Sequence, residues 1–360
     1  MNRDAALAVI APVVARMPDP TGSSETEALE HELAQRFGAR YAVSTSSGTA
    51  ALHTALAAAG IGTSDEVLLP AATVVMTVAA IVATGAHPVF VDSPPGQLGM
   101  DPDDAAAKIG PRTRALICVH LFGRTHGLTQ AADLARKHGL LLIEDACQAQ
   151  GSRHHDHEAG TAGAIGCFSL KDGKILACGE GGYLLTDDHA FAAQAASWRN
   201  HGLTAAPGAA AGTRLGHNFR LAQPLAALAR YHLTDFDAAL SQRRSHHDRL
   251  IHALADTPGL KPLPATTGHN GYSPVWHISL PKPRAFATRL SELGVVNSVG
   301  TFGLRAAPLQ PWCSPLEPAP CPNAAQLLDQ LLAITLTARH QDHDLDELAA
   351  LVDREARAWA

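Results

Sequence analysis

The chain has 360 residues, of which 46% are hydrophobic and 17% charged, and it carries a formal net charge of −6. This composition describes a globular protein with room for two domains, and the lack of a long basic run argues against a nucleic-acid or anionic-membrane partner. Because no apolar run is as long as a membrane span and the six cysteines form no C-x-x-C pair, we expect a cytoplasmic protein with reduced, buried cysteines.

The N-terminal segment, residues 1–24, begins with an apolar run after Arg3, as a signal peptide does. However, Asp4 cancels that charge and Pro12 interrupts the run. Apolar side chains instead recur at helical spacing, at Leu7, Ile10, Val14 and Met17. The pattern favours a short amphipathic helix over a cleaved signal, and we expect the segment to pack with the small domain.

Residues 25–235 alternate between helical and strand-like segments, and we interpret them as one large domain. The expected helices span 25–37, 48–60, 73–84, 102–109 and 128–138. The expected strands span 40–44, 66–69, 88–91, 114–119, 140–144, 164–168 and 183–186. Short apolar strands separated by helices predict an α/β domain with a mainly parallel sheet that helices cover on both faces. Ligands of such sheets bind beyond the carboxyl ends of the strands.

Residues 236–360 follow a different pattern, which predicts a smaller α+β domain. It begins with a long polar helix over 236–254, followed by a loop or edge segment at 258–264 and a strand at 275–280. Further helices are expected at 284–293, 324–336 and 345–359. A proline-rich loop at 308–322 interrupts this domain, and an alanine-rich run at 205–211 in the large domain is expected to be a mobile loop.

The stretch from Gly163 to Tyr183 places two lysines between apolar strands. The first strand ends near Ser169, Lys171 and Lys174 follow it, and a glycine cluster precedes the second strand. Glycines let backbone pass close to a bulky group, and a lysine between buried strands is costly unless it has a chemical use, such as a Schiff base. The alternative is that both lysines are solvated loop charges, which this stretch alone favours.

The sequence Ser46-Ser-Gly-Thr49 lies between an expected strand and an expected helix. Backbone N–H groups and a hydroxyl at a helix N-terminus form an anion site. The simpler interpretation is a helix cap made by serine or threonine, and the motif taken alone favours it.

Two adjacent carboxylates, Glu144 and Asp145, end the strand at 140–144. Successive side chains of a strand point to opposite faces, so only one of the two need face the ligand crevice. Asp145 can hold a protonated ring nitrogen, bind a metal or act as a base, or it can cap the following segment. We favour a functional role for it.

The run His154-His-Asp-His157 resembles a metal site, but it lacks the regular ligand spacing of one helix face and has glycine and charged residues around it. A solvated hairpin tip is the favoured interpretation. His340 and His343 are interpreted as solvated in the same way, and we expect no metal site.

A set of motifs in a fixed order gives the chain a family resemblance. They are Ser46-Ser-Gly-Thr-Ala-Ala-Leu-His53, Asp65-Glu-Val-Leu-Leu-Pro70, Val119-His-Leu-Phe-Gly123, Ile143-Glu-Asp-Ala-Cys-Gln-Ala-Gln-Gly151, Cys167-Phe-Ser-Leu-Lys-Asp-Gly-Lys174, Gly179-Glu-Gly-Gly182, Asn200-His-Gly202 and Gly216-His-Asn-Phe-Arg220. Together they resemble the DegT/DnrJ/EryC1/StrS aminotransferases, which are enzymes of fold type I that depend on pyridoxal 5'-phosphate (PLP). The likeness is close over about residues 25–250 and looser beyond, and it implies a mainly parallel sheet of seven strands.

The resemblance also implies roles for single residues. Lys174 falls where the family's PLP lysine lies, five residues after the serine of Phe-Ser-Leu, whereas Lys171 does not fit that spacing. Asp145 is expected to bind the pyridine nitrogen, and Gln148 to lie beside the ring hydroxyl. The remaining contacts, to the cofactor phosphate, are expected from Gly48, Thr49 and Ser169 and from Asn218 of a neighbouring subunit, which implies a homodimer with shared active sites.

One position departs from the family pattern. The family usually places an aromatic residue against the PLP ring after Pro-x-x-Thr, but this chain has Val74 there, which can pack on the ring without stacking. The Ile-Leu-Ala-Cys-Gly sequence after Lys174 looks closer to the aminocyclitol and aminohydroxybenzoate branch than to the nucleotide-sugar enzymes.

The function implied is amino transfer from glutamate or glutamine to a keto group of a sugar, cyclitol or related secondary metabolite, through a Lys174 aldimine and a 1,3-proton shift. Loops at 205–213 and 308–322 are expected to contact the acceptor. Val74 and the Lys171-Asp172-Gly173 insert motivate an alternative, in which PLP supports elimination, cyclisation or condensation of an amino-acid-like substrate. A second alternative is a non-enzymatic binding or regulatory protein of the same fold.

Overall fold

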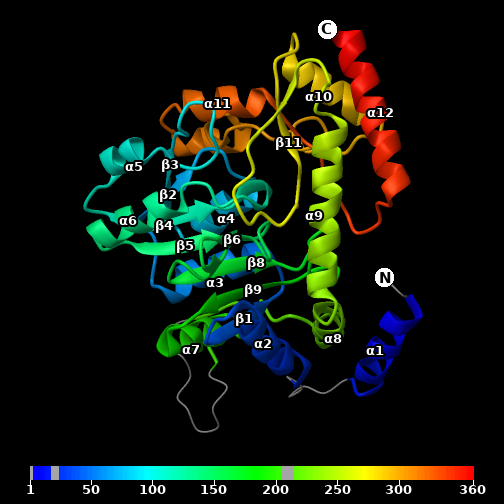
Figure 1. Cartoon of the computed structure of the whole chain (residues 1–360). Coiled ribbons are helices and arrows are strands. Elements are labelled where there is room, and N and C mark those ends of the chain that lie inside the picture. Colours follow the sequence, from blue (N-terminus) through cyan, green and yellow to red (C-terminus); the bar gives the residue numbers. More distant parts are fainter. Residues whose placement is uncertain (1–2, 18–23, 204–214) are drawn as a thin grey trace.

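The computed structural model describes residues 3–17, 24–203 and 215–360. The mobile loop expected at 205–211 and the acceptor-contacting loop expected at 205–213 both lie outside these residues. Figure 1 shows the α/β part of the chain below a smaller C-terminal part, with one long helix, α9, running beside both.

The main sheet has seven strands in the order β1-β9-β8-β5-β4-β2-β3. These are β1 (Tyr41–Thr45), β2 (Glu66–Pro70), β3 (His87–Val91), β4 (Thr113–Val119), β5 (Leu141–Asp145), β8 (Ile165–Ser169) and β9 (Gly182–Thr186). Adjacent strands are parallel, except that β9 is antiparallel to both of its neighbours. The expectation of a mainly parallel, seven-stranded sheet is therefore confirmed.

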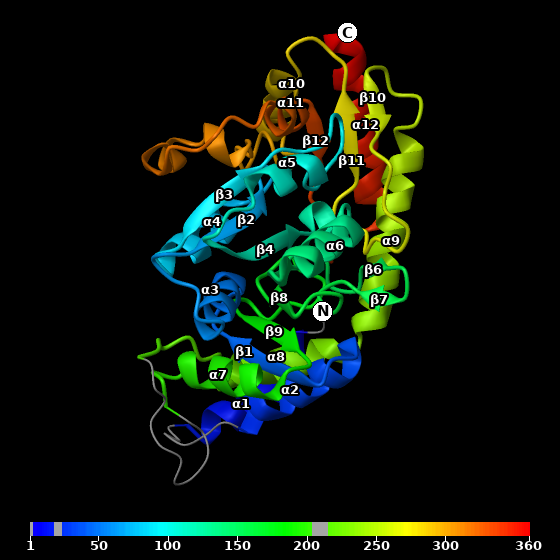
Figure 2. The ribbon, with the colours of Figure 1, turned by 90° about the vertical axis from the view of Figure 1, so that its left-hand side faces the viewer.

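Helices cover both faces of this sheet. They are α2 (Ser24–Phe37), α3 (Gly48–Ala58), α4 (Val75–Ala83), α5 (Pro102–Lys108), α6 (Leu128–His138), α7 (His189–Trp198) and α8 (Gln223–Leu233). Alternate strand residues pack to opposite sides: Val67 and Ile117 lie in the core with α3 and α4, whereas Leu68 and Leu116 lie in the core with α5 and α6. Figure 2 shows α3 and α6 on either side of the strands. Helices α7 and α8 were not predicted, because their buried positions are mostly alanine and give a weak apolar stripe.

The C-terminal part contains a three-stranded antiparallel sheet in the order β10-β11-β12. Its elements are α9 (Phe236–Ala253), β10 (Leu260–Pro262), β11 (Val275–Ile278), α10 (Pro283–Glu292), α11 (Pro322–Asp329), β12 (Leu331–Ala333) and α12 (Asp342–Trp359). The helix predicted over 324–336 is wrong in its second half, where β12 pairs with β11. Residues 331–336 are buried except for the partly buried Thr335, so the spacing of their apolar side chains cannot distinguish a strand from a helix.

Helix α1 (Arg3–Ala15) confirms the expected N-terminal helix but not its place. It packs against α8, which lies within residues 25–235, rather than against the small domain. Ala6 and Val13 are buried, whereas Leu7 and Val14, expected on the buried face, are 55% and 51% exposed.

The six cysteines are all unpaired and all but Cys147 are buried, as expected for reduced thiols. In the ranges that the structure covers, no helix is long and apolar enough to cross a membrane.

Candidate active site

A cavity of about 590 Å³ lies at the carboxyl edge of the main sheet. One side of it, which we call the strand-end wall, comes from residues at or just after the ends of β1, β2, β5 and β8: Ser47, Gly48, Thr49, Thr73, Val74, Asp145, Cys147, Gln148 and Ser169. The other side, the loop wall, comes from the C-terminal part: Tyr272, Ser273, Ser298, Phe302, Gln310, Trp312 and Thr335. The cavity therefore lies where ligands of doubly covered parallel sheets bind.

The residues predicted for the cofactor site come together in this cavity, with one exception. Its lining includes Gly48, Thr49, Val74, Asp145, Gln148, Ser169 and Lys174. Asn218 does not line it; this residue is exposed and forms a backbone bridge with Asn200. Its predicted role toward a neighbouring subunit stays a prediction.

Asp145 is a buried carboxylate without an ionic partner among the residues that the structure describes. Only 4% of the residue is exposed. Thr77 donates a hydrogen bond from Oγ1 to Asp145 Oδ2 at 2.6 Å, and the backbone N–H of Cys147 donates to Oδ1 at 3.2 Å. Among the described residues, no lysine, arginine or histidine forms an ion pair with it. A buried carboxylate in this state suits a cationic ligand atom in the cavity.

Glu144 points away from the cavity, as strand alternation requires. Its side chain and that of His120 are both fully buried, and His120 Nε2 donates to Glu144 Oε2 at 2.7 Å. The backbone N–H groups of Gly160 and Gly163 also donate to this carboxylate, at 2.8 and 2.6 Å. Burial acts to raise the pKa of Glu144, but these hydrogen bonds outweigh it and lower the pKa below its ordinary value. Glu144 therefore fixes the loop at 160–163 on the side of β5 opposite to the cavity.

The N-terminus of α3 approaches Ser169 closely. Ser47 caps the helix, and its Oγ accepts from the N–H of Ala50 at 3.1 Å, so the expected cap is present. A Cβ added at Gly48 would lie 2.8 Å from Cys147 Sγ and 2.9 Å from Ser169 Cβ. Glycine at 182 is needed as well, because a Cβ there would collide with the Ser47 carbonyl group. These glycines bring free helix N–H groups and the Ser169 hydroxyl to one place, which is a site suited to an anion.

Lys174 lies on the connection between β8 and β9, and the connection folds back on itself. Leu170 N–H donates to Gly181 O at 2.8 Å, and Asp172 N–H donates to Gly179 O at 3.0 Å. Lys174 is partly buried, and its Nζ donates to Tyr272 Oη at 3.2 Å. Lys171, by contrast, is exposed at the cavity rim. Lys174, which has the family's spacing from Ser169, is thus partly buried in the cavity, whereas Lys171, which lacks that spacing, is exposed.

Gln148 is held by an unusual turn after β4. Its Oε1 accepts from the N–H of Phe122 at 2.7 Å. Phe122 has φ 61°, a left-handed conformation that an aromatic residue rarely adopts. Strain of this kind is often kept where a ligand is bound, and Phe122 itself lines the cavity.

Several residues in or beside the cavity are not among the predicted site residues; Thr77 does not line the cavity but contacts Asp145, and the others line it. Thr77 lies one helical turn beyond Thr73, to which it is hydrogen-bonded at 3.2 Å, so its spacing from the predicted motif was a usable signal. Gln310 and Trp312 belong to the loop expected to contact the acceptor, although neither was singled out. Tyr272 had no sequence signal, because it lies about a hundred positions from Lys174 in the chain.

The histidine run at 154–157 forms the expected hairpin. β6 (Arg153–His154) pairs with β7 (His157–Glu158), and the tip residues His155 and Asp156 are exposed.

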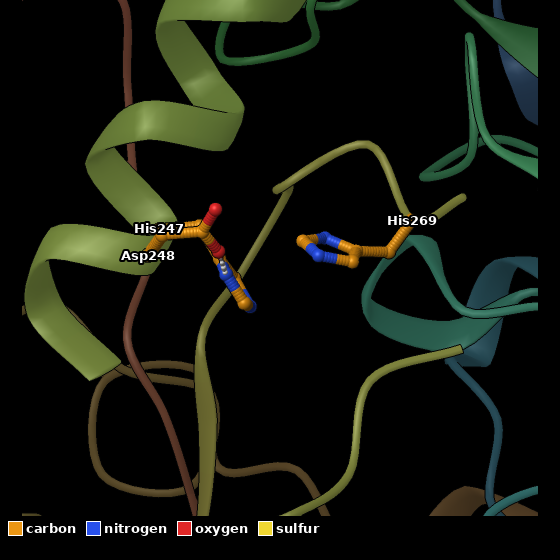
Figure 3. Close-up of side chains that lie close together, drawn as sticks. All are labelled: His247, Asp248 and His269. Carbon is orange, nitrogen blue, oxygen red and sulfur yellow. Dashed lines mark hydrogen bonds and ion pairs between the residues drawn. The ribbon is translucent and has the colours of Figure 1, made fainter. Parts of the chain in front are cut away.

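A different cluster brings together His247 and Asp248 of α9 and His269 of the following loop (Figure 3). Its potential ligand atoms lie within 4.8 Å of one another. Burial, and then His247, lowers the pKa of His269 to about 4. The charge of Arg124 acts in the same direction on both histidines. Because the same charge opposes a cation, we assign no metal to this cluster.

The fold and the cavity, with an amine and an unpaired carboxylate at the carboxyl edge of a seven-stranded sheet, define a fold type I transferase. The model of the DegT/DnrJ/EryC1/StrS aminotransferase family matches residues 19–353, and the chain belongs to that family.

Individual relatives agree with this assignment. The chain is 35% identical over 283 residues to the L-glutamine:2-deoxy-scyllo-inosose aminotransferase of Streptomyces kanamyceticus, which covers 74% of this chain and 66% of that protein. Among solved structures, the aminotransferase TlmJ of Streptoalloteichus hindustanus is 28% identical with a TM-score of 0.88, covering 99% of this chain and 97% of the other. DesV of S. venezuelae, solved with a ketimine intermediate, is 29% identical with a TM-score of 0.86, covering 99% and 94%.

Proposed function

We propose that the chain is a PLP-dependent aminotransferase that moves an amino group from glutamate or glutamine to a keto group of a sugar, cyclitol or related metabolite. The observation that carries the proposal is the meeting of Lys174 and Asp145 in one cavity, on a chain of this family. Among the described residues, neither Lys174 nor Asp145 forms a salt bridge. A stabilising ion pair therefore does not explain why the two charged groups lie there.

The residues of the strand-end wall fit PLP. The free N–H groups of α3 with Thr49 and Ser169 suit the phosphate, and Asp145 suits a protonated ring nitrogen. Gln148 would lie near the ring hydroxyl, and Val74 would pack on the ring. When bound, PLP supplies an aldehyde for amines and a ring that takes up electrons during proton removal.

Asp145 and Lys174 have distinct roles in this proposal. Asp145, held by Thr77 and the Cys147 N–H, keeps its charge directed at the ring nitrogen. Lys174 would provide the amine that holds the cofactor, and its Nζ, when free, would be the base that takes up and returns the proton at the substrate's α-carbon. The two walls exclude bulk water from this transfer, since Lys174 is partly and Asp145 almost fully buried.

The loop wall suits a polar ring-shaped acceptor. Phe302, Trp312 and Tyr272 offer aromatic faces to one side of the cavity, and Ser298, Gln310 and Thr335 offer hydrogen-bonding groups. The S. kanamyceticus relative is named for a keto cyclitol and for glutamine, which supports this choice of acceptor and donor.

We further propose a homodimer in the cytoplasm. Asn218 is exposed and outside the cavity of its own chain, which suits a residue that completes the phosphate site of a second copy. The six unpaired cysteines suit a reducing compartment.

A second candidate, PLP chemistry other than transamination, is favoured by Val74, which lines the cavity where the family has an aromatic ring. The experiment that separates the two incubates the PLP-loaded protein with glutamine or glutamate and a panel of keto cyclitols and keto sugars. Amino transfer to an acceptor, absent in Lys174→Ala and present in Lys171→Ala, is the result we expect. Product formed from an amine without any acceptor would support the second candidate, and transamination by Lys174→Ala would contradict the assigned role of Lys174.

A further inference from the structure

One side chain of the loop wall meets the Lys174 amine from across the cavity. Lys174 Nζ lies 3.2 Å from Tyr272 Oη, to which it donates a hydrogen bond, and 4.8 Å from the centre of the Tyr272 ring. Two attractions therefore act on the same ammonium group, one to the phenol oxygen and one to the ring face. No carboxylate forms an ion pair with Lys174 among the residues that the structure describes.

Tyr272 is itself fixed by a buried amide. Asn270, which is 1% exposed, accepts a hydrogen bond from the Tyr272 N–H at 2.9 Å through Oδ1. Through Nδ2 it donates to Gln148 O and Gln150 O, at 2.9 and 3.0 Å. The backbone of Tyr272 is thus tied to the segment that follows Asp145.

The next residue along the loop tightens this arrangement. Gly271 has φ 71°, and a Cβ added there would lie 2.6 Å from Arg243 O of α9. Only glycine accommodates both the positive φ and the close approach. The loop therefore presents Tyr272 from a backbone with little freedom, whereas the flexible stem of Lys174 has much rotamer freedom to lose.

We propose that Tyr272 is a positioning residue for Lys174, an inference that rests on the proposed function. It holds Nζ toward the cofactor site in two steps of the reaction. In the first, Nζ bonds to the carbon of the PLP aldehyde and the aldehyde oxygen leaves as water. In the second, Nζ, released by substrate, receives the proton that leaves the donor's α-carbon.

The first test follows the attachment of PLP to the cofactor-free protein. Samples are reduced with borohydride at increasing times, and mass spectrometry measures the label on the peptide that contains Lys174. Tyr272→Phe keeps the ring and loses Oη, so attachment is expected to slow about tenfold, because the attacking amine loses the hydrogen bond that orients it. Tyr272→Leu also loses the ring and is expected to be slower still, while Tyr231→Phe of α8, outside the cavity, matches the wild-type rate.

The second test separates positioning from a packing role. In the half-reaction with glutamate, Tyr272→Phe should lower kcat about tenfold and leave KM within about twofold, because the amine and not the substrate is misplaced. Deuterium on the donor's α-carbon should slow this variant more than the wild type, since proton movement limits its rate. A packing role would instead change KM or Tm and leave the isotope effect alone.

The outcomes distinguish this inference from the function on which it rests. A label on Lys174 in the wild type, with unchanged attachment and kcat in Tyr272→Phe, overturns the role of Tyr272 alone. A wild-type label on another residue overturns both.

Discussion

The two walls of the cavity are built by different means. The strand-end wall consists of residues at or just after the carboxyl ends of strands of the main sheet, so the register of the sheet fixes the places of Gly48, Asp145 and Ser169. The loop wall consists of residues from connections in the C-terminal part, such as Tyr272, Phe302 and Trp312, whose places depend on how long loops fold over the sheet.

The difference suggests that the strand-end wall binds the cofactor and the loop wall recognises the acceptor. A wall whose geometry follows from the sheet can keep one cofactor in place while the opposite wall changes. Substitutions in the strand-end wall should therefore damage every substrate's reaction. Substitutions in the loop wall should affect the acceptor selectively, apart from Tyr272, which contacts Lys174.

The largest effect is expected for Asp145→Asn in the strand-end wall. Asparagine keeps the shape and the hydrogen bond with Thr77 but loses the charge that pairs with the ring nitrogen. Loss of one partner of a buried charged pair should lower kcat on the order of 10³-fold. Stopped-flow measurement of both half-reactions checks this, with Asp172→Asn at the exposed rim as the matched control. A decrease in only one half-reaction would contradict the comparison.

Glu144→Gln tests the support behind the same wall. The amide cannot accept all the hydrogen bonds that the carboxylate takes from His120, Gly160 and Gly163, so a donor is left unpaired in a fully buried place. We expect the free energy of unfolding to fall by about 3 kcal/mol, as for a broken buried pair. Urea denaturation measures it, and Asp133→Asn, in an exposed pair with Arg136, should leave the midpoint unchanged.

The folded protein should lose stability at acid pH. Burial lowers the pKa of His53 in α3, of His126 after β4 and of His269 near Tyr272 from 6.5 to about 4. Between pH 6.5 and about pH 4 these histidines are protonated in the unfolded chain but neutral in the folded chain. The free energy of unfolding therefore falls as the pH decreases through this window. We expect a loss of about 2 to 5 kcal/mol in total between pH 7 and pH 4.

Thermal unfolding at a series of pH values measures this loss. His53→Phe should reduce its size without changing stability much at pH 7, because phenylalanine keeps the ring contact with Trp198 and takes up no proton. A stability that stays constant from pH 7 to pH 4 would contradict the burial of these histidines as neutral groups.

The smallest effect is expected for Trp312→Ala in the loop wall. Trp312 is 38% exposed, so its loss removes a face for the acceptor with little change in stability. KM for the keto acceptor should rise about tenfold, while the half-reaction with glutamate keeps its rate. If the glutamate half-reaction slowed equally, the loop wall would not be specific to the acceptor.

Much of the strand-end wall could be predicted from the sequence. Asp145 ends an apolar strand, and Gly48 opens a helix after another, so the parallel sheet places both at one edge. The choice of Lys174 over Lys171 came from the family spacing, because periodicity favoured solvated charges for both. The structure separates them, with Lys174 partly buried and Lys171 exposed.

The loop wall could not be predicted in the same detail. Tyr272 reaches Lys174 only because the buried Asn270 ties its loop to Gln148, a tertiary contact that leaves no periodic trace in the chain. The residues of β12 alone predict the end of a helix for a related reason. A short run buried on all sides shows no period, and only its pairing with β11 determines its structure.

The central claim is that one nitrogen, Lys174 Nζ, carries the cofactor. Borohydride reduction of the PLP-loaded protein, followed by peptide mapping, tests it most directly. The account predicts a single pyridoxyl label on Lys174, which is lost in Lys174→Ala and kept in Lys171→Ala. A label on Lys171 or elsewhere, or no label on a protein that still transaminates, would contradict it.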